Sequence, residues 1–144
     1  VPMVRVGEPV PDFRLVDQRN RPVALSQLRG RVVVVNFVYT NCALPNFCLR
    51  LANHFGVLQK RFARELGRDL VLLTLTFDPQ RDTPQVLATY AAQWGVHAFS
   101  NEGLLDHSLH TAIVDREGRL AANIEGNQFT AAQLGDLAAA VIAR

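Results

Sequence analysis

The only two cysteines of the chain lie six positions apart in FVYTNCALPNFCLRL, residues 37 to 51. Cys42 follows a β-branched apolar run that predicts a central strand, and it precedes a stretch with helical spacing. Ligands of open α/β sheets bind at the carboxyl ends of such strands, and the dipole of the following helix favours a thiolate there. The position of Cys42 therefore predicts a nucleophilic or metal-binding thiol.

The spacing of the pair places a condition on the backbone between the sulfurs. On a continuous helix, residues six positions apart lie about 9 Å apart along the axis and roughly 240° apart around it. A disulfide needs Cα atoms within about 7 Å, so that geometry could not close. Pro45 also restricts Leu44 to extended conformations. We predict a loop or irregular first turn from Cys42 to Cys48, a helix that is regular only near Cys48, and a disulfide that forms readily.

Spacing alone leaves several interpretations of the cysteines open. Free cysteine is often buried as a small apolar residue, and an inert disulfide would leave the chain a binding module. A thiol–disulfide oxidoreductase would use Cys42 to attack and Cys48 to resolve, although the usual C-x-x-C motif is absent. Two soft sulfurs with one imidazole would instead suit copper(I).

Two histidines near the end of the chain are candidates for that imidazole. His107 and His110 flank the start of an expected strand, three residues apart, so in an extended strand they point to opposite faces. Only one of them can face a given site. For His54, in the helix after the cysteines, we expect a solvated or half-buried position, and we assign no function to His97.

Two acidic residues lie in the segment FDPQRDTP. Asp82 is explained as the N-cap of a following helix. Asp78 ends the second buried strand, where a carboxylate could approach a metal or orient a histidine.

The pattern of the whole chain indicates one α/β domain over residues 1–144. We expect a mixed sheet between helices in three layers, with an N-terminal hairpin as a lid on one edge. The expected elements are a hairpin within residues 12–30, strands at 31–40 and 69–77, helices at about 51–66 and 84–94, a hairpin within 111–126, and a closing helix capped by Thr130.

The composition narrows the function classes. Hydrophobic residues make up 49% and charged residues 19% of the chain, and the net charge is +2. The basic residues are scattered, which gives little support to nucleic-acid binding. No apolar run reaches the roughly 18 residues of a membrane span, and the first residues lack the apolar core of a secretion signal. Two cysteines fit either a cytosolic thiol pair or a periplasmic disulfide.

Several motifs together resemble the Sco/SenC family of thioredoxin-like copper chaperones of cytochrome c oxidase. The matching segments are GEPVPDFRLVDQRNRPVALSQLRGRVVVVNFVYTNC, the second cysteine at Cys48, TFDPQRDTPQVLATYAAQWG, and DHSLHTAIVDREGRL. The resemblance covers most of the chain. The FDPxRDTP run and the DHS before the strand that ends at Asp115 are its specific parts.

The resemblance implies a thioredoxin-like α/β/α domain that binds copper, as copper(I) or copper(II), through Cys42, Cys48 and His107. It implies copper delivery as the main role, to the copper-receiving subunit of a cytochrome oxidase or to another periplasmic thiol or copper protein. It also implies a place on the periplasmic side of the inner membrane, with an anchor preceding residue 1. Thiol–disulfide oxidoreductase activity without a stable metal is the alternative.

The chain departs from the family pattern at two places. The commoner motif is C-x3-C, whereas C-x5-C here requires a wider loop. The family usually has a further strand and helix before the DHS motif, whereas only GVHAFSNEGLL separates Trp94 from Asp106. Either the chain has lost this unit, which predicts a sheet with one strand fewer, or the unit is missing from the sequence as it stands. The family resemblance also bears on the alternative, because thioredoxin-like reductases normally have a cis-proline near the position of Leu109. No proline follows Pro84, and this weakens the oxidoreductase hypothesis.

Overall fold

The computed structural model describes residues 5–12, 14–37, 45–76, 85, 97–100, 110–125 and 129–144, and the fold is that of these residues. They form a seven-stranded sheet with two α-helices and one short 3-10 helix. The strands are β1 (Arg14–Asp17), β2 (Pro22–Ala24), β3 (Val32–Phe37), β4 (Leu70–Thr76), β5 (His97–Ser100), β6 (His110–Val114) and β7 (Leu120–Glu125). The helices are η1 (Leu25–Leu28), α1 (Pro45–Arg61) and α3 (Ala131–Ile142).

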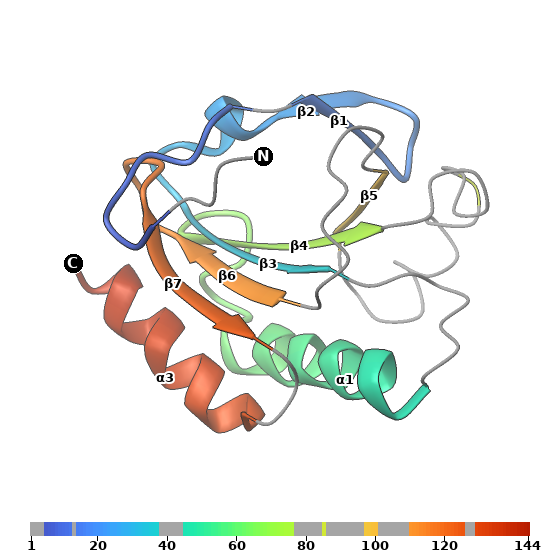
Figure 1. The fold of residues 1–144 in the computed structure, drawn as a ribbon, viewed down its shortest axis with the longest axis vertical. Coiled ribbons are helices and arrows are strands. Elements are labelled where there is room, and N and C mark those ends of the chain that lie inside the picture. Colours follow the sequence, from blue (N-terminus) through green and yellow to red (C-terminus); the bar gives the residue numbers. More distant parts are fainter. Residues whose placement is uncertain are drawn as a thin grey trace.

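The strand order is β2-β1-β5-β4-β3-β6-β7 (Figure 1). Strands β3, β4 and β5 run parallel, while β1, β2, β6 and β7 join through antiparallel pairs. The predicted mixed sheet is therefore confirmed. The N-terminal hairpin β1–β2 forms one edge of the sheet, as predicted, and the C-terminal hairpin β6–β7 forms the other.

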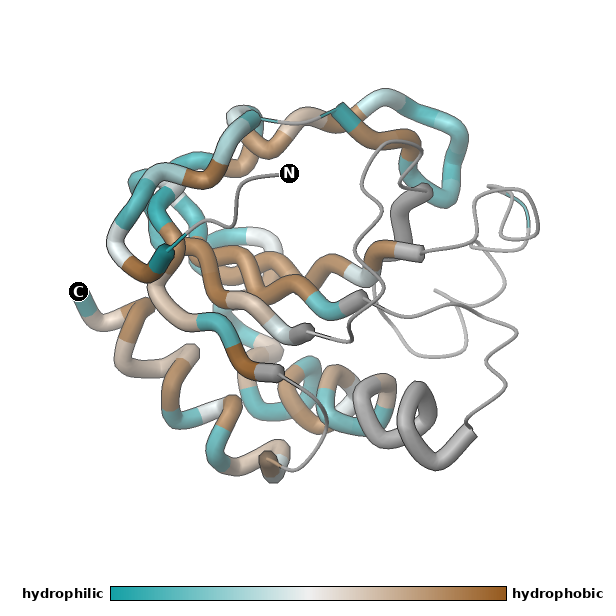
Figure 2. Tube along the Cα trace, viewed as in Figure 1, coloured by the Kyte–Doolittle hydropathy of each residue, from teal (hydrophilic) through white to brown (hydrophobic). Residues whose placement is uncertain are grey.

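One face of the sheet packs against α1 and α3 (Figure 1). Helix α1 follows β3 and precedes β4, so it crosses back along the strands, and its apolar stripe repeats at helical spacing. Strands β3 and β4 are strongly hydrophobic along most of their length (Figure 2). The main core on this face contains Val32, Val34, Phe55, Leu58, Phe62, Leu70, Leu72, Ile113, Leu134, Ala138 and Val141.

The opposite face packs against the N-terminal hairpin. Alternate residues of β3 and β4, among them Val33 and Val71, point to this face and contact Leu15 of β1. Val10, Val23 and Leu28 complete the cover. The helix predicted at 84–94, which would add the third layer, lies outside the described residues except for Gln85.

Strand β5 corrects one prediction. The shortened segment before the DHS motif suggested a sheet with one strand fewer, but His97–Ser100 forms a strand between β4 and β1. It pairs in parallel with β4 through Leu73–Thr76 and antiparallel with β1. Four residues are enough for a strand when both neighbours supply hydrogen-bonding partners. The sheet thus joins its hairpin edge to its centre through β5.

The two helix ends reflect local sequence. Helix α1 ends at Arg61, earlier than the predicted residue 66, and turns continue to Gly67, which has a φ of 82° that suits glycine. Helix α3 begins as predicted. Its N-cap Thr130 accepts a hydrogen bond from the amide of Gln133 at 3.1 Å, and the Gln133 side chain accepts one from the amide of Thr130 at 2.9 Å.

Candidate metal centre

The second cysteine, Cys48, lies in the first turn of α1, which begins at Pro45 at the carboxyl end of the sheet. Proline suits the first helical position because its φ is already helical and its missing N–H has no partner there. We predicted a helix that becomes regular only near Cys48, and this boundary is wrong by three residues. Pro45 opens the helix instead of prolonging the loop.

The remaining predicted site residues lie outside the described residues. Cys42 and Asp78 follow the ends of β3 and β4, and His107 precedes β6. His110 is the first residue of β6, and its backbone pairs with Glu125 of β7. The contrast predicted between His107 and His110 therefore stays a prediction, as does the Cys42–Cys48 disulfide.

The described residues around this end of the sheet include a buried polar row, which we define as Asn36, Thr74 and Thr111. Asn36 of β3 pairs in register with Thr74 of β4 and with Thr111 of β6. The three side chains are 1%, 2% and 1% exposed. They share the helix-facing side with Val34, Leu72 and Ile113, which lie two residues away along their strands.

The burial of His54 differs from the expectation based on the sequence. We expected a solvated or half-buried residue, but His54 is 6% exposed. Its ring lies 4.8 Å from the ring of Phe129, in the segment before α3. This contact joins residues far apart in the sequence, which explains why helical spacing alone did not indicate burial.

Neither the polar row nor the burial of His54 was predicted. Asn36 interrupts the valines of β3, and this is the one signal in the sequence that a polar group enters the core there. Its alignment with Thr74 and Thr111 depends on strand register, which composition does not reveal. The row places hydrogen-bonding groups next to the end of the sheet from which the chain leaves toward Cys42.

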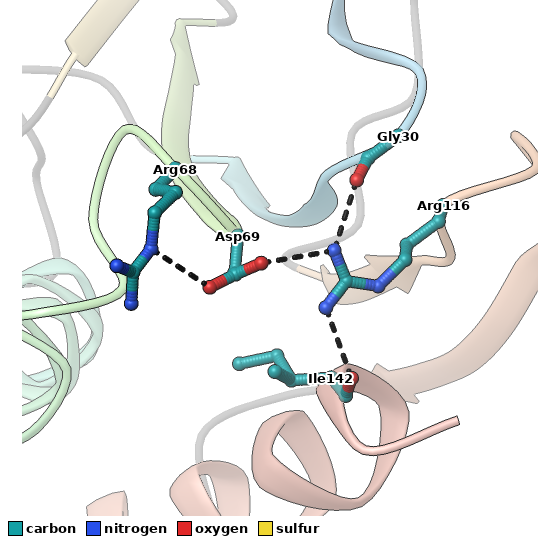
Figure 3. A network of polar contacts seen from close by, with 5 residues as sticks. All are labelled: Gly30, Arg68, Asp69, Arg116 and Ile142. Carbon is teal, nitrogen blue, oxygen red and sulfur yellow. Dashed lines mark hydrogen bonds and ion pairs between the residues drawn. The ribbon is translucent and has the colours of Figure 1, made fainter.

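The amino ends of β3 and β4 carry a different cluster, centred on Arg116 (Figure 3). The Arg116 guanidinium donates from Nη1 to the Gly30 carbonyl at 3.0 Å and to Asp69 Oδ1 at 3.1 Å. Its Nη2 donates to the Ile142 carbonyl at 3.0 Å. We call these four residues the Arg116 clamp, because they tie the β6–β7 turn to the starts of β3 and β4 and to the end of α3.

The charges of the clamp change the titration of its carboxylate. The hydrogen bond from Arg116 lowers the pKa of Asp69 below its ordinary value, partial desolvation opposes this, and a hydrogen bond from Arg68 at 3.3 Å lowers it further. A carboxylate held by two guanidinium groups is a structural ion pair. No group of three or more histidine, cysteine or acidic residues suited to a metal occurs among the described residues.

Comparison with known proteins identifies the family. The SCO1/SenC family model matches residues 5–103, which include the β3–α1 segment with both cysteines. The chain belongs to the SCO1/SenC family. The match ends before His107, so the role of this histidine rests on its motif. No helix in the described part of the chain is long and apolar enough to span a membrane.

A curated relative and two solved structures illustrate the similarity. The SCO1 protein homolog of Bacillus subtilis strain 168 is 31% identical over 85 residues, which span 59% of this chain and 42% of that protein. The structure of BsSco, described as a member of the Sco family of cytochrome c oxidase assembly proteins with a disulfide switch, superposes with a TM-score of 0.76 at 18% identity, covering 98% of each chain. Yeast Sco1 with copper bound gives 0.73 at 23% identity, covering 90% of each chain.

These superpositions show that the fold is thioredoxin-like, as the sequence resemblance implied. The aligned part spans less than half of the Bacillus relative, so the function of a whole protein does not transfer by alignment alone. A donor set of two thiolates and one imidazole is chemically suited to copper, a soft metal ion in its reduced state. Within this fold, Cys48 is held at the start of a helix whose dipole favours negative charge.

Proposed function

We propose that this chain is a copper-binding metallochaperone domain that assists assembly of a respiratory oxidase copper site. Its ligands would be the thiolates of Cys42 and Cys48 and the imidazole of His107. The observation that carries the proposal is the C-x5-C pair, which follows the central strand β3 in a chain of the SCO1/SenC family. The copper bound to yeast Sco1, which shares the fold, supports the choice of metal.

The chemistry of delivery follows from the ligands. Two thiolates and an imidazole hold copper(I) firmly. Oxidation of the two thiolates to a disulfide would pass two electrons to a disulfide of a partner, which takes up two protons and becomes two thiols, and would leave a single imidazole, so the metal would be released. Copper transfer and disulfide formation are therefore coupled at one site. The recipient would be the copper-receiving subunit of a cytochrome oxidase or another periplasmic thiol or copper protein.

The compartment follows from the same chemistry. Disulfides persist in the periplasm and are rare in the cytosol, where thiols are kept reduced. A chaperone that cycles between copper thiolate and disulfide would work on the periplasmic side of the inner membrane. We place this domain there, tethered by a segment that precedes residue 1.

Copper titration of the reduced protein tests the proposal. We expect one copper(I) per chain, measured by metal analysis and native mass spectrometry, and no binding by the Cys42→Ser/Cys48→Ser variant. Asn123→Ala, at an exposed position of β7, is a matched control that should bind as the wild type does. Absence of copper binding by the reduced wild type would refute the proposal.

The second candidate is a thiol–disulfide oxidoreductase without a stable metal, which the disulfide switch described for BsSco favours. Cys42 would attack a substrate disulfide, and Cys48 would resolve the mixed disulfide and release the reduced substrate. Catalytic reduction of a small protein disulfide, with glutathione as the electron source and without copper binding, would favour this candidate. A disulfide that resists reduction, with no copper binding, would indicate an inert structural bridge.

A further inference from the structure

The two helices meet along a seam that begins at His54. The ring of His54 lies 4.8 Å from the ring of Phe129, which directly precedes the N-cap of α3, and the rings are tilted by 44°. About two turns further along α1, Nη2 of Arg61 donates to Oδ1 of Asp136 in α3 at 2.9 Å. The two contacts follow the same order along both segments, so the helices run in the same direction.

His54 is the ionisable residue of an otherwise apolar part of this seam. It is 6% exposed, and its neighbours Phe55 and Leu58 in α1 are buried together with Leu134 and Ala138 of α3. A neutral imidazole packs here as an aromatic ring, whereas an imidazolium would bring a charge into the core. Burial therefore favours the neutral form of the ring.

The charges of the two helices favour the neutral form as well. Helix α1 contains no acidic residue, and its charged residues besides His54 are Arg50, Lys60 and Arg61. The segment 126–130 also contains no acidic residue. The one carboxylate of α3 is that of Asp136, and it is bound to Arg61 about two turns away from His54. An imidazolium would therefore lie among positive charges of its own helix.

The described part of the sheet adds no negative charge on this face. The strand residues in the core beneath the helices are apolar, and the polar row that follows them is uncharged. His110 and Glu125 are paired at the ends of their strands, and strand alternation predicts that both project to the opposite face. The positive end of the α3 dipole lies at Thr130, next to Phe129, and it also disfavours an imidazolium there.

We propose that His54 is an acid-sensitive latch between the two helices. The neutral ring holds Phe129 and the start of α3 against α1, and uptake of a proton from solvent releases this contact. The face of the Phe129 ring offsets only part of the cost of the charge. This inference goes beyond the proposed function, because it involves neither the cysteines nor copper.

The direction of the pH dependence follows from the burial of the ring. The opened seam exposes His54, which then takes up a proton at the ordinary pKa of histidine, about 6.5. The closed seam binds this proton less readily. The stabilisation by the neutral ring is therefore fully present above about pH 6.5 and is lost as the pH falls below that value.

Hydrogen exchange of the reduced, copper-free full chain tests the latch. The amides of α3 are followed by mass spectrometry between about pH 7.5 and pH 5, with rates corrected for the intrinsic pH dependence of exchange. The opening constant of α3 should rise at least about tenfold over this range in the wild type. In His54→Phe, which cannot take up the proton, it should rise less than about threefold.

Phe55→Leu is the matched control. It removes buried volume beside His54 but no ionisable group, so α3 should open more at every pH and still show the wild-type rise. His54→Gln is polar but does not titrate, and it should remove the rise as His54→Phe does. It decides the question if His54→Phe does not fold.

Nuclear magnetic resonance of the His54 ring in the wild type needs no variant. Its Cε1–H signal should show a neutral ring down to about pH 5.5. A ring that takes up its proton at pH 6.5 or above, as it would beside a carboxylate, would overturn the inference. An opening constant that does not rise in the wild type, or that rises equally in the two His54 variants, would overturn it too. Copper binding enters none of these measurements, so failure of the latch is distinguishable from failure of the proposed copper delivery.

Discussion

At the amino ends of β3 and β4, short connections and charged side chains close the fold, whereas the carboxyl end of β3 is followed in the sequence by both cysteines. The closed end is built from the Arg116 clamp and from the β6–β7 turn, in which Asp115 accepts hydrogen bonds from the amides of Glu117 and Arg119 at 2.9 Å. The carboxyl end contains the polar row of Asn36, Thr74 and Thr111.

The polar groups at the two ends of the sheet differ in how well they are paired. In the clamp, both terminal nitrogens of the Arg116 guanidinium donate hydrogen bonds to carbonyl or carboxylate oxygens, so these polar groups stabilise the fold. In the polar row, the Thr111 hydroxyl is buried and has no hydrogen-bond partner among the described residues, which costs stability. Such costs concentrate at functional sites. We therefore expect changes at the clamp to alter stability, and changes at the carboxyl end to alter copper and redox chemistry.

Arg116→Met should produce the largest effect on stability. The variant keeps the apolar stem but removes the donors to the Gly30 and Ile142 carbonyls, and we expect a loss of about 2 kcal/mol in the free energy of unfolding. Urea denaturation followed by circular dichroism measures it. Arg68→Met is the control, because Arg68 is 74% exposed and solvent screens its ion pair with Asp69, so the loss of stability should be much smaller.

Copper stoichiometry of Arg116→Met should equal that of the wild type. A loss of copper binding in this variant, while it is still folded, would show that the two ends of the strands are energetically coupled. The expectation that the clamp affects stability alone, and that only the carboxyl end affects copper binding, would then be wrong.

His107→Ala should produce the next largest effect, confined to the carboxyl end. Loss of one ligand of three should weaken copper(I) binding at least about tenfold, or about 1.4 kcal/mol. The unfolding free energy should change little. Competition with a copper(I) chelator of known affinity measures the binding constant.

His110→Ala is the matched variant for this experiment. His110 begins β6 three residues after His107 in the sequence. Strand alternation predicts opposite faces for the two side chains. We expect nearly unchanged copper affinity. Equal losses in the two variants, or a larger loss for His110→Ala, would contradict the assignment of the imidazole ligand.

Most elements of the fold were predictable because their signals are local. The valines of β3, the apolar run of β4 and the Thr130 cap of α3 each carry their structure in a few adjacent residues. Strand β5 was missed because four residues show no clear alternation, and its strand conformation depends on pairing with β4 and β1.

The site was predictable only as a set of residue types. The cysteine pair and the family motifs identified the candidates, but the burial of His54 and the polar row depend on tertiary packing. The ring of His54 contacts the ring of Phe129. Asn36 of β3 pairs with Thr111 of β6, and these two strands lie far apart in the sequence. Sequence spacing contains no information on such contacts, because they are set by register and by the docking of helices.

Thr130→Ala should cost about 1 kcal/mol of unfolding free energy, since the threonine oxygen caps α3. Phe129, which covers His54, precedes this cap, so the variant tests whether stability near the carboxyl end can be lowered without changing copper chemistry. Thr130→Ser keeps the capping oxygen and should restore stability. A copper affinity that falls with Thr130→Ala and returns with Thr130→Ser would show that the cap supports the site.

The smallest expected effect is the acid sensitivity that Asp69 gives to the clamp. Arg116, and secondarily Arg68, lower the pKa of Asp69 in the folded chain, so the folded state favours the carboxylate. Its contribution to stability is fully present above the ordinary pKa of an aspartate and is lost as the pH falls through the lower pKa of the folded state.

The side chain of residue 69 cannot titrate in the Asp69→Asn variant. The free energy of unfolding should therefore fall less steeply in this variant than in the wild type between about pH 5 and pH 2, and the difference between the two proteins should shrink toward the acid limit. Urea titrations across this range measure both slopes. Arg116→Met should reduce the wild-type slope in the same direction, because it removes the main cause of the pKa shift. Identical slopes in the wild type and Asp69→Asn would show that solvent screens the ion pair and that the clamp stabilises the fold through its carbonyl bonds alone.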